Sequence, residues 1–332
     1  MSLRPSRQKQ REPWPIDRLI RERSLALGCA LDRSTHSTYS SAVNSYLNFC
    51  KSHNFPIAPT PDTLSFYVVF MSHHINPSSV DSYLSGICSL LEPYFPTIRS
   101  CRASPLVAKT LTGCKRRHGS EAKRKSPLSR ADLARVTAAY AGQTGHDDLL
   151  FIAQLLTGFS ALLRLGELTV PDNPSLRNSR KLSLRYTVAV SPNAVSFSLP
   201  GHKADRFFEG NKIVLTARAD TTDPCRAVIS YLRSRDALHP FHPQLWLLRD
   251  GTPPSRAWFL ARLRKHFPSP SIAGQSLRAG GATDLAERGA PPHIIQAAGR
   301  WASNTFQVYI RKNPFLLQAM LFPLPLTPPT SA

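Results

Sequence analysis

The chain has 332 residues, a length that favours two domains, and 42% of them are hydrophobic, enough for packed cores. Its formal net charge is +21 and its isoelectric point is near 10.3, which indicates a polyanionic partner because lysine and arginine release counterions from phosphates. A basic protein on a membrane surface is the alternative, but no apolar run approaches the ~20 residues that span a bilayer.

The N-terminal sequence and the cysteine spacing predict the cellular compartment of the protein. The first residues include no apolar segment, so we expect no secretory signal. The six cysteines are scattered without C-x-x-C spacing, which predicts reduced intracellular thiols rather than disulfides or a metal site. We therefore expect neither a metal nor a cofactor.

The N-terminal third divides by composition. Residues 1–24 are polar and rich in arginine, which predicts a disordered basic arm. Residues 25–114 are expected to form a helical domain. Within them Val43, Tyr46 and Cys50 recur at the spacing of one helix face.

Three further helix starts are predicted in this domain, at Pro61, Pro77 and Ser104. Thr60 or Asp62 is the expected cap of the first of them. Helices joined by short loops predict an all-α bundle.

Residues 115–126 form a basic, polar stretch that suits an interdomain linker. Its six basic side chains are the expected contacts to a phosphate backbone: Lys115, Arg116, Arg117, Lys123, Arg124 and Lys125.

Residues 127–322 are predicted to form a second domain. Residues 149–168 have the composition of a strongly apolar helix, interrupted by Arg164. A guanidinium group inside an apolar helix is costly to bury unless it is paired, so Arg164 is singled out.

Three short strands are expected inside this domain. Residues 182–190 and 195–199 alternate with period two around a turn at 191–194, and residues 212–216 follow. The predicted fold class is therefore mainly α with a small antiparallel sheet. The tail at residues 323–332 is rich in proline, serine and threonine and is expected to be disordered.

The most informative motifs lie near the C-terminus. Residues 275–283 read Gln-Ser-Leu-Arg-Ala-Gly-Gly-Ala-Thr, residues 299–301 read Gly-Arg-Trp, and Tyr309 follows. These motifs resemble the active-site end of tyrosine recombinases, the DNA breaking-rejoining family that includes phage integrases. They look most similar to the recombinases of Crypton-like eukaryotic mobile elements.

The resemblance implies a role for each residue of an ordered set. Arg164 and Arg278 would hold the scissile phosphate, since a planar guanidinium binds two phosphate oxygens at once. Glu167 would orient Arg164. Lys203, between two predicted strands, would protonate the leaving 5′ oxygen, and Tyr309 would be the nucleophile.

Each of these residues also has a structural interpretation. Arg164 and Glu167 are spaced as an ordinary i,i+3 ion pair. Arg278 could be a solvated first-turn residue, Lys203 a solvated hairpin lysine and Tyr309 a core tyrosine. The presence of the whole set in family order favours the catalytic interpretation.

Two positions depart from the family pattern. Gln275 stands where relatives have histidine, and an amide donates hydrogen bonds but cannot shuttle a proton. Losing a general acid–base group typically costs roughly 10²–10⁴-fold in rate. Arg300 occupies the position of a family histidine or tryptophan, with Trp301 one residue later, so either side chain could contact the phosphate.

The resemblance implies an all-α core-binding domain followed by an α+β catalytic domain. It implies a site-specific recombinase or integrase that acts through a 3′-phosphotyrosyl intermediate on double-stranded DNA, as a homo-oligomer and without a membrane or a small-molecule substrate. A nuclear location is expected if the source is eukaryotic, and the cytoplasm or nucleoid otherwise. The alternative is a DNA-binding protein on the same fold with impaired or lost catalysis.

Overall fold

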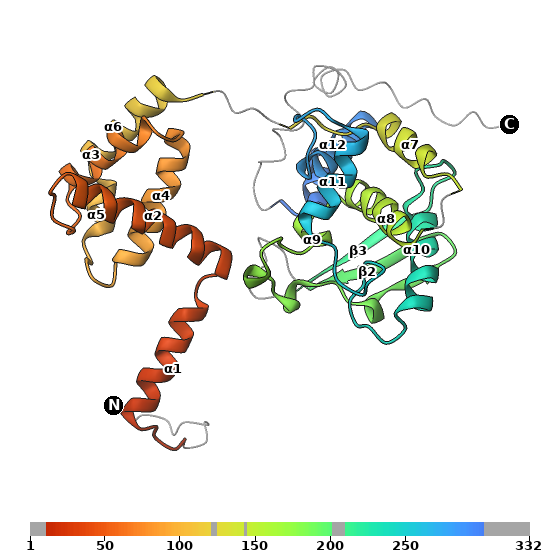
Figure 1. Cartoon of the computed structure of the whole chain (residues 1–332), viewed down its shortest axis with the longest axis horizontal. Coiled ribbons are helices and arrows are strands. Elements are labelled where there is room, and N and C mark those ends of the chain that lie inside the picture. The colour runs from red at the N-terminus through yellow and green to blue at the C-terminus, as the bar shows by residue number, and fades with distance from the viewer. Residues whose placement is uncertain (1–10, 121–124, 143–144, 201–209, 302–332) are drawn as a thin grey trace, which may run out of the picture. The chain divides into compact units, whose positions relative to one another are not determined.

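The computed structural model describes residues 11–120, 125–142, 145–200 and 210–301 (Figure 1). The chain divides into two compact units, Met1–Ala122 and Lys123–Ala332. The described residues are mainly helical and include one three-stranded antiparallel sheet, which confirms the predicted fold class. None of their helices is both long and apolar enough to cross a bilayer.

The first unit is a helical bundle with a single apolar core. Its helices are α1 (Ile16–Cys29), α2 (Arg33–Ser52), α3 (Pro61–Ser72), α4 (Pro77–Leu91), α5 (Ile98–Ala103) and α6 (Pro105–His118). Tyr46, Leu64 and Leu84 are fully buried where α2, α3 and α4 meet. Thr60 caps α3, with its hydroxyl accepting from the backbone of Thr63 at 3.1 Å.

The structure differs from the sequence prediction at both ends of this unit. Residues 16–24, expected to be disordered, lie in α1, whose apolar side chains are largely exposed. Strong helix formers such as leucine, arginine and glutamate fill this segment, so local propensity explains the helix. Residues 115–118, assigned to the linker, form the last turn of α6.

The second unit packs helices around the sheet. Its elements are α7 (Arg130–Ala139), α8 (His146–Ser160), α9 (Leu165–Leu168), three 3₁₀ turns, β1 (Ala189–Ser191), β2 (Ala194–Leu199), β3 (Asn211–Thr216), α10 (Pro224–Leu238), α11 (Arg256–His266), α12 (Gln275–Glu287) and α13 (Pro292–Gly299). The strand order is β1-β2-β3.

The sheet buries one face against α8 and α10. Phe197 pairs with Ile213 across β2 and β3, and both belong to a core that includes Leu150 and Tyr231. The first predicted strand is mostly wrong, because only residues 189–191 pair with β2. Residues 185–187 form a 3₁₀ turn, and Leu184 makes an isolated antiparallel bridge with Gln244.

The predicted helix over residues 149–168 is broken in the middle. Helix α8 ends at Ser160, and Leu162 adopts a left-handed conformation with φ 51°. The Leu163 amide donates to the Gly158 carbonyl at 2.9 Å and the Leu162 amide donates to the Phe159 carbonyl at 3.3 Å, which is a Schellman ending. The chain therefore turns before Arg164, and this arginine lies between two helices rather than inside one.

Helix α12 crosses α8 at very close range. A Cβ atom on Gly281 would overlap the carbonyl oxygen of Phe159, and one on Gly280 would overlap the carbonyl oxygen of Leu128. The two glycines therefore permit a backbone-to-backbone approach. This approach brings Arg278 beside the turn that ends α8.

We predict that Gly281→Ala destabilises the protein, although alanine is the better helix former. Overpacking of a core costs roughly 1–3 kcal/mol, because the Phe159 backbone must move. Gly113→Ala on α6 is the matched control, since its Cβ would meet open space, and it should stabilise by about 1 kcal/mol. Urea unfolding of both variants measures the difference, and equal effects at the two positions would contradict the close approach.

Candidate active site

Arg164 and Glu167 form a reciprocal cap at the start of α9. The Arg164 backbone amide donates to Glu167 Oε2 at 3.0 Å, and Arg164 Nη1 donates to Glu167 Oε1 at 3.0 Å. The Glu167 side chain is 6% exposed and that of Arg164 is 32% exposed. The i,i+3 pair is therefore present, and it leaves part of the Arg164 guanidinium open to solvent.

Arg300 approaches the same carboxylate from the end of α13. Its Nη2 donates to Glu167 Oε2 at 3.0 Å, and its Nη1 donates to the Ala161 carbonyl at 3.4 Å. Burial lowers the pKa of the Arg300 guanidinium and nearby Arg164 lowers it further, while Glu167 acts in the opposite direction. Glu167 is thus the single carboxylate that both of these arginines contact.

Arg278 is buried beside this pair of arginines, with 5% of its surface exposed. Its Nη1 donates to the Leu162 carbonyl at 2.8 Å, and its Nη2 donates to the Gly299 carbonyl. The Trp301 ring lies against it, with 4.2 Å from Cζ to the ring centroid. The interpretation of Arg278 as a solvated residue is therefore wrong.

The backbone is strained on both sides of Arg278. Leu162 ends α8 and Arg300 ends α13, each in the left-handed position of a Schellman turn where glycine is usual. A left-handed non-glycine residue costs roughly 1–2 kcal/mol. These two turns place the carbonyl groups of Leu162 and Gly299 where they accept from Arg278. Strained backbone of this kind concentrates at functional sites.

Arg300 and Trp301, which the sequence leaves as alternatives, face different partners. Arg300 points to Glu167 and Trp301 to Arg278. Gly299 makes this possible, because the Trp301 ring occupies the space that a Cβ at Gly299 would need.

Of the other predicted site residues, the structure describes Gln275. Gln275 is exposed at the first residue of α12. Lys203 and Tyr309 lie outside the described residues, so their predicted roles stay predictions.

In the basic stretch at residues 115–126, two lysine side chains already have partners within the protein. Lys115 Nζ contacts Asp81 Oδ2 at 2.8 Å, whereas Arg116 and Arg117 are exposed. Lys125 Nζ donates to the Pro270 carbonyl at 2.7 Å. Lys123 and Arg124 lie outside the described residues.

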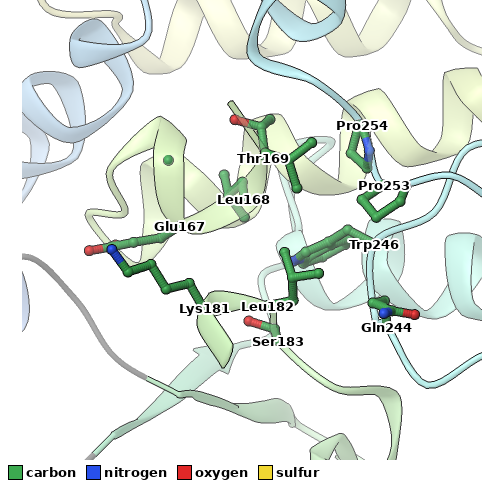
Figure 2. Close-up of a pocket in the computed structure, with 12 residues that line it drawn as sticks. Glu167, Leu168, Thr169, Lys181, Leu182, Ser183, Gln244, Trp246, Pro253 and Pro254 are labelled. Carbon is green, nitrogen blue, oxygen red and sulfur yellow. The ribbon is translucent and has the colours of Figure 1, made fainter. Parts of the chain in front are cut away.

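A small pocket adjoins Glu167 (Figure 2). Lys181 extends toward Glu167 in this view, and Trp246 is among the residues that line the pocket. Ser183 Oγ and Trp246 Nε1 line the pocket as buried polar atoms with no hydrogen-bond partner in the described structure. Such atoms are normally satisfied by protein or by ordered water.

One further residue, which the sequence does not single out, supports this site. Gln154 is fully buried in α8 and donates its Nε2 to the Leu168 carbonyl at 2.7 Å, which ties down the end of α9. The only available signal is an amide within an apolar helical run.

Electrostatically, the site favours an anion. Three guanidinium groups (Arg164, Arg278 and Arg300) against one carboxylate (Glu167) leave a surplus of two positive charges, 3 − 1. In the part of the chain that the structure describes, no group of histidine, cysteine and acidic residues is arranged to hold a metal ion. Guanidinium groups held at fixed positions are suited to bind phosphate oxygens.

No protein-family model and no curated protein matches this sequence. Solved structures do match. The XerH site-specific recombinase, in a post-cleavage complex with its difH substrate, has a TM-score of 0.58 and 15% identity, over 86% of this chain and 78% of XerH. The fold is that of the tyrosine recombinases.

Two further recombinase-type structures match over most of their length. The Tn1549 transposon integrase, in complex with transposon right end DNA, has a TM-score of 0.55 and 13% identity, covering 92% of this chain and 96% of that one. A lambda integrase dimer bound to a core site has a TM-score of 0.52 and 15% identity, covering 88% and 93%. At these identities the likeness concerns the fold.

We predict that Glu167→Gln destabilises the protein by roughly 3–5 kcal/mol, because it leaves the buried guanidinium of Arg300 without its counter-charge. Chemical denaturation measures the change. The control is Glu92→Gln, which removes an exposed partner of Arg99 and should have little effect. A Glu167→Gln protein as stable as the wild type would show that this carboxylate does not hold the arginines together.

Proposed function

We propose that the protein is a tyrosine recombinase that cleaves and rejoins duplex DNA. The observation that carries the proposal is the pairing of Arg164 and Arg300 with the buried Glu167 carboxylate, on a recombinase fold. Arg278 donates to the carbonyl groups of Leu162 and Gly299, close in the chain to those two arginines. Arginines gathered from three separate segments match the need to stabilise charge on a phosphate undergoing substitution.

The proposed chemistry is a metal-free transesterification. The Tyr309 phenolate oxygen forms a bond to phosphorus while the bond from phosphorus to the 5′ oxygen breaks, leaving a 3′-phosphotyrosyl link. Lys203 gives a proton to the departing 5′ oxygen, and Arg164 and Arg278 balance the charge of the phosphate oxygens. A 5′-hydroxyl of another strand then reverses these steps, so no nucleotide is hydrolysed.

The partners follow from this chemistry. We infer that the substrate is duplex DNA, that exposed Arg116 and Arg117 contact its phosphates, and that the working form is a homo-oligomer on DNA. Support comes from the net charge of +21 and from the DNA complexes of the matching recombinases. We further propose a mobile-element recombinase of the Crypton-like kind, acting in the nucleus of a eukaryotic host.

A DNA-binding protein without catalysis is the second candidate, because Gln275 replaces the family histidine. It shares the fold, the basic charge and the arginines, so only a test of covalent chemistry separates it from the enzyme.

We predict that the protein forms a covalent adduct with nicked suicide duplexes, in which the cleaved fragment diffuses away and traps the intermediate. A pool with randomised sequence around the nick removes the need to know the target, and sequencing of the trapped DNA identifies it. Tyr309→Phe should abolish the adduct and leave DNA binding intact. Tyr186→Phe, at an exposed tyrosine, is the matched control and should retain the adduct. Tight DNA binding with no adduct from the wild type would support the non-catalytic candidate.

We also predict that Gln275→His raises the rate of adduct formation and leaves DNA affinity nearly unchanged. The reason is that imidazole can shuttle a proton, and such groups typically contribute roughly 10²–10⁴-fold. Single-turnover cleavage at saturating DNA measures the rate. A slower variant would show that the site is adapted to the amide.

A further inference from the structure

Arg218 stands out among the cations outside the candidate active site. It follows β3 at the start of the turn that leads to α10, and it is partly buried. Its Nη1 is buried without a hydrogen-bond partner anywhere in the described chain, and no carboxylate pairs with its guanidinium there. Buried charges are normally paired, so the unpaired guanidinium of Arg218 indicates a site for an anionic partner.

The acidic residues near Arg218 are already occupied by other arginines. Asp284 accepts from Arg130 Nη2 at 3.0 Å and from Arg288 Nη2 at 2.8 Å. Asp220 contacts Arg130 Nη1 at 3.4 Å and also accepts from the Thr222 hydroxyl at 2.6 Å. Arg218 therefore lacks a counter-charge of its own.

The group as a whole is electropositive. Three arginines (Arg130, Arg218, Arg288) against two aspartates (Asp220, Asp284) leave one positive charge, 3 − 2. Burial lowers the pKa of the Arg218 guanidinium and nearby Arg130 and Arg288 lower it further, while Asp284 and Asp220 act in the opposite direction. The charge on Arg218 is thus disfavoured in the free protein, and an anion at this place would relieve the conflict.

Helix α12 links this cluster to the candidate active site. Arg278 lies in its first turns, while Asp284 and Arg288 lie at its C-terminal end. Ten residues separate Arg278 from Arg288, which corresponds to about 15 Å along a helix axis. One DNA segment several base pairs long covers such a distance, at about 3.4 Å per base pair.

We propose that Arg218, flanked by Arg130 and Arg288, binds a phosphodiester group of the DNA backbone away from the scissile phosphate. The inference rests on the proposed function, because duplex DNA is the polyanion in question. The planar guanidinium offers two parallel N–H donors to phosphate oxygens, and the ion pairs to Asp284 hold the two flanking arginines in place. The site positions the duplex and carries no sequence information.

The test compares Arg218→Gln with the wild type in two measurements. Fluorescence anisotropy with a labelled duplex, repeated over a range of salt concentrations, should show that the slope of log affinity against log salt becomes shallower by about 0.9, the value for one lost phosphate contact. Thermal unfolding without DNA should give an unchanged or higher Tm, because removing an unpaired half-buried charge relieves repulsion.

Arg233→Gln is the matched control, since it removes an equal charge from an exposed position on α10. It should leave the slope nearly unchanged. An unchanged slope for Arg218→Gln, or an equal change in both variants, would overturn the inference. A lower Tm with an unchanged slope would assign Arg218 to the stability of the fold instead. Failure of the proposed function looks different, because it appears as a wild-type protein that forms no covalent adduct.

Discussion

The buried carboxylate of Glu167 is the interaction on which the site depends. It accepts from the Arg164 backbone, from the Arg164 guanidinium and from Arg300, and so joins the start of α9 to the end of α13. Without it, two like charges would lie together in a largely buried place, where unpaired charges are costly. A phosphate bound by these arginines would add a second anion to the same network.

Backbone strain and close packing also help to position the arginines of this site. Leu162 and Arg300 occupy left-handed positions at roughly 1–2 kcal/mol each, and their turns direct two carbonyl groups to Arg278. The glycines of α12 allow this helix to approach α8 at backbone distance. A guanidinium held by carbonyl groups and by the Trp301 ring has few rotamers left, which suits the phosphate-binding role proposed for Arg278.

The sequence predicted the types and order of the helices and strands better than the points at which the chain leaves a helix or strand. Periodicity located the first-unit helices from α2 to α4 and strands β2 and β3, because buried faces impose a regular spacing. It placed Arg164 inside a helix, since a Schellman turn with leucine at the left-handed position has no sequence signal. Residues 182–188 alternate like a strand, yet they contain a 3₁₀ turn at 185–187 and one isolated bridge at Leu184. The opposite orientations of Arg300 and Trp301 depend on tertiary contacts that spacing does not encode.

The most direct test of the account is to identify the amino acid that becomes linked to DNA. The wild-type protein is trapped on a nicked duplex, digested with nuclease and protease, and the remaining nucleotide–peptide adduct is sequenced by tandem mass spectrometry. We expect a nucleotide joined through its 3′ phosphate to the side chain of Tyr309. A link to any other residue, or through a 5′ phosphate, would contradict it.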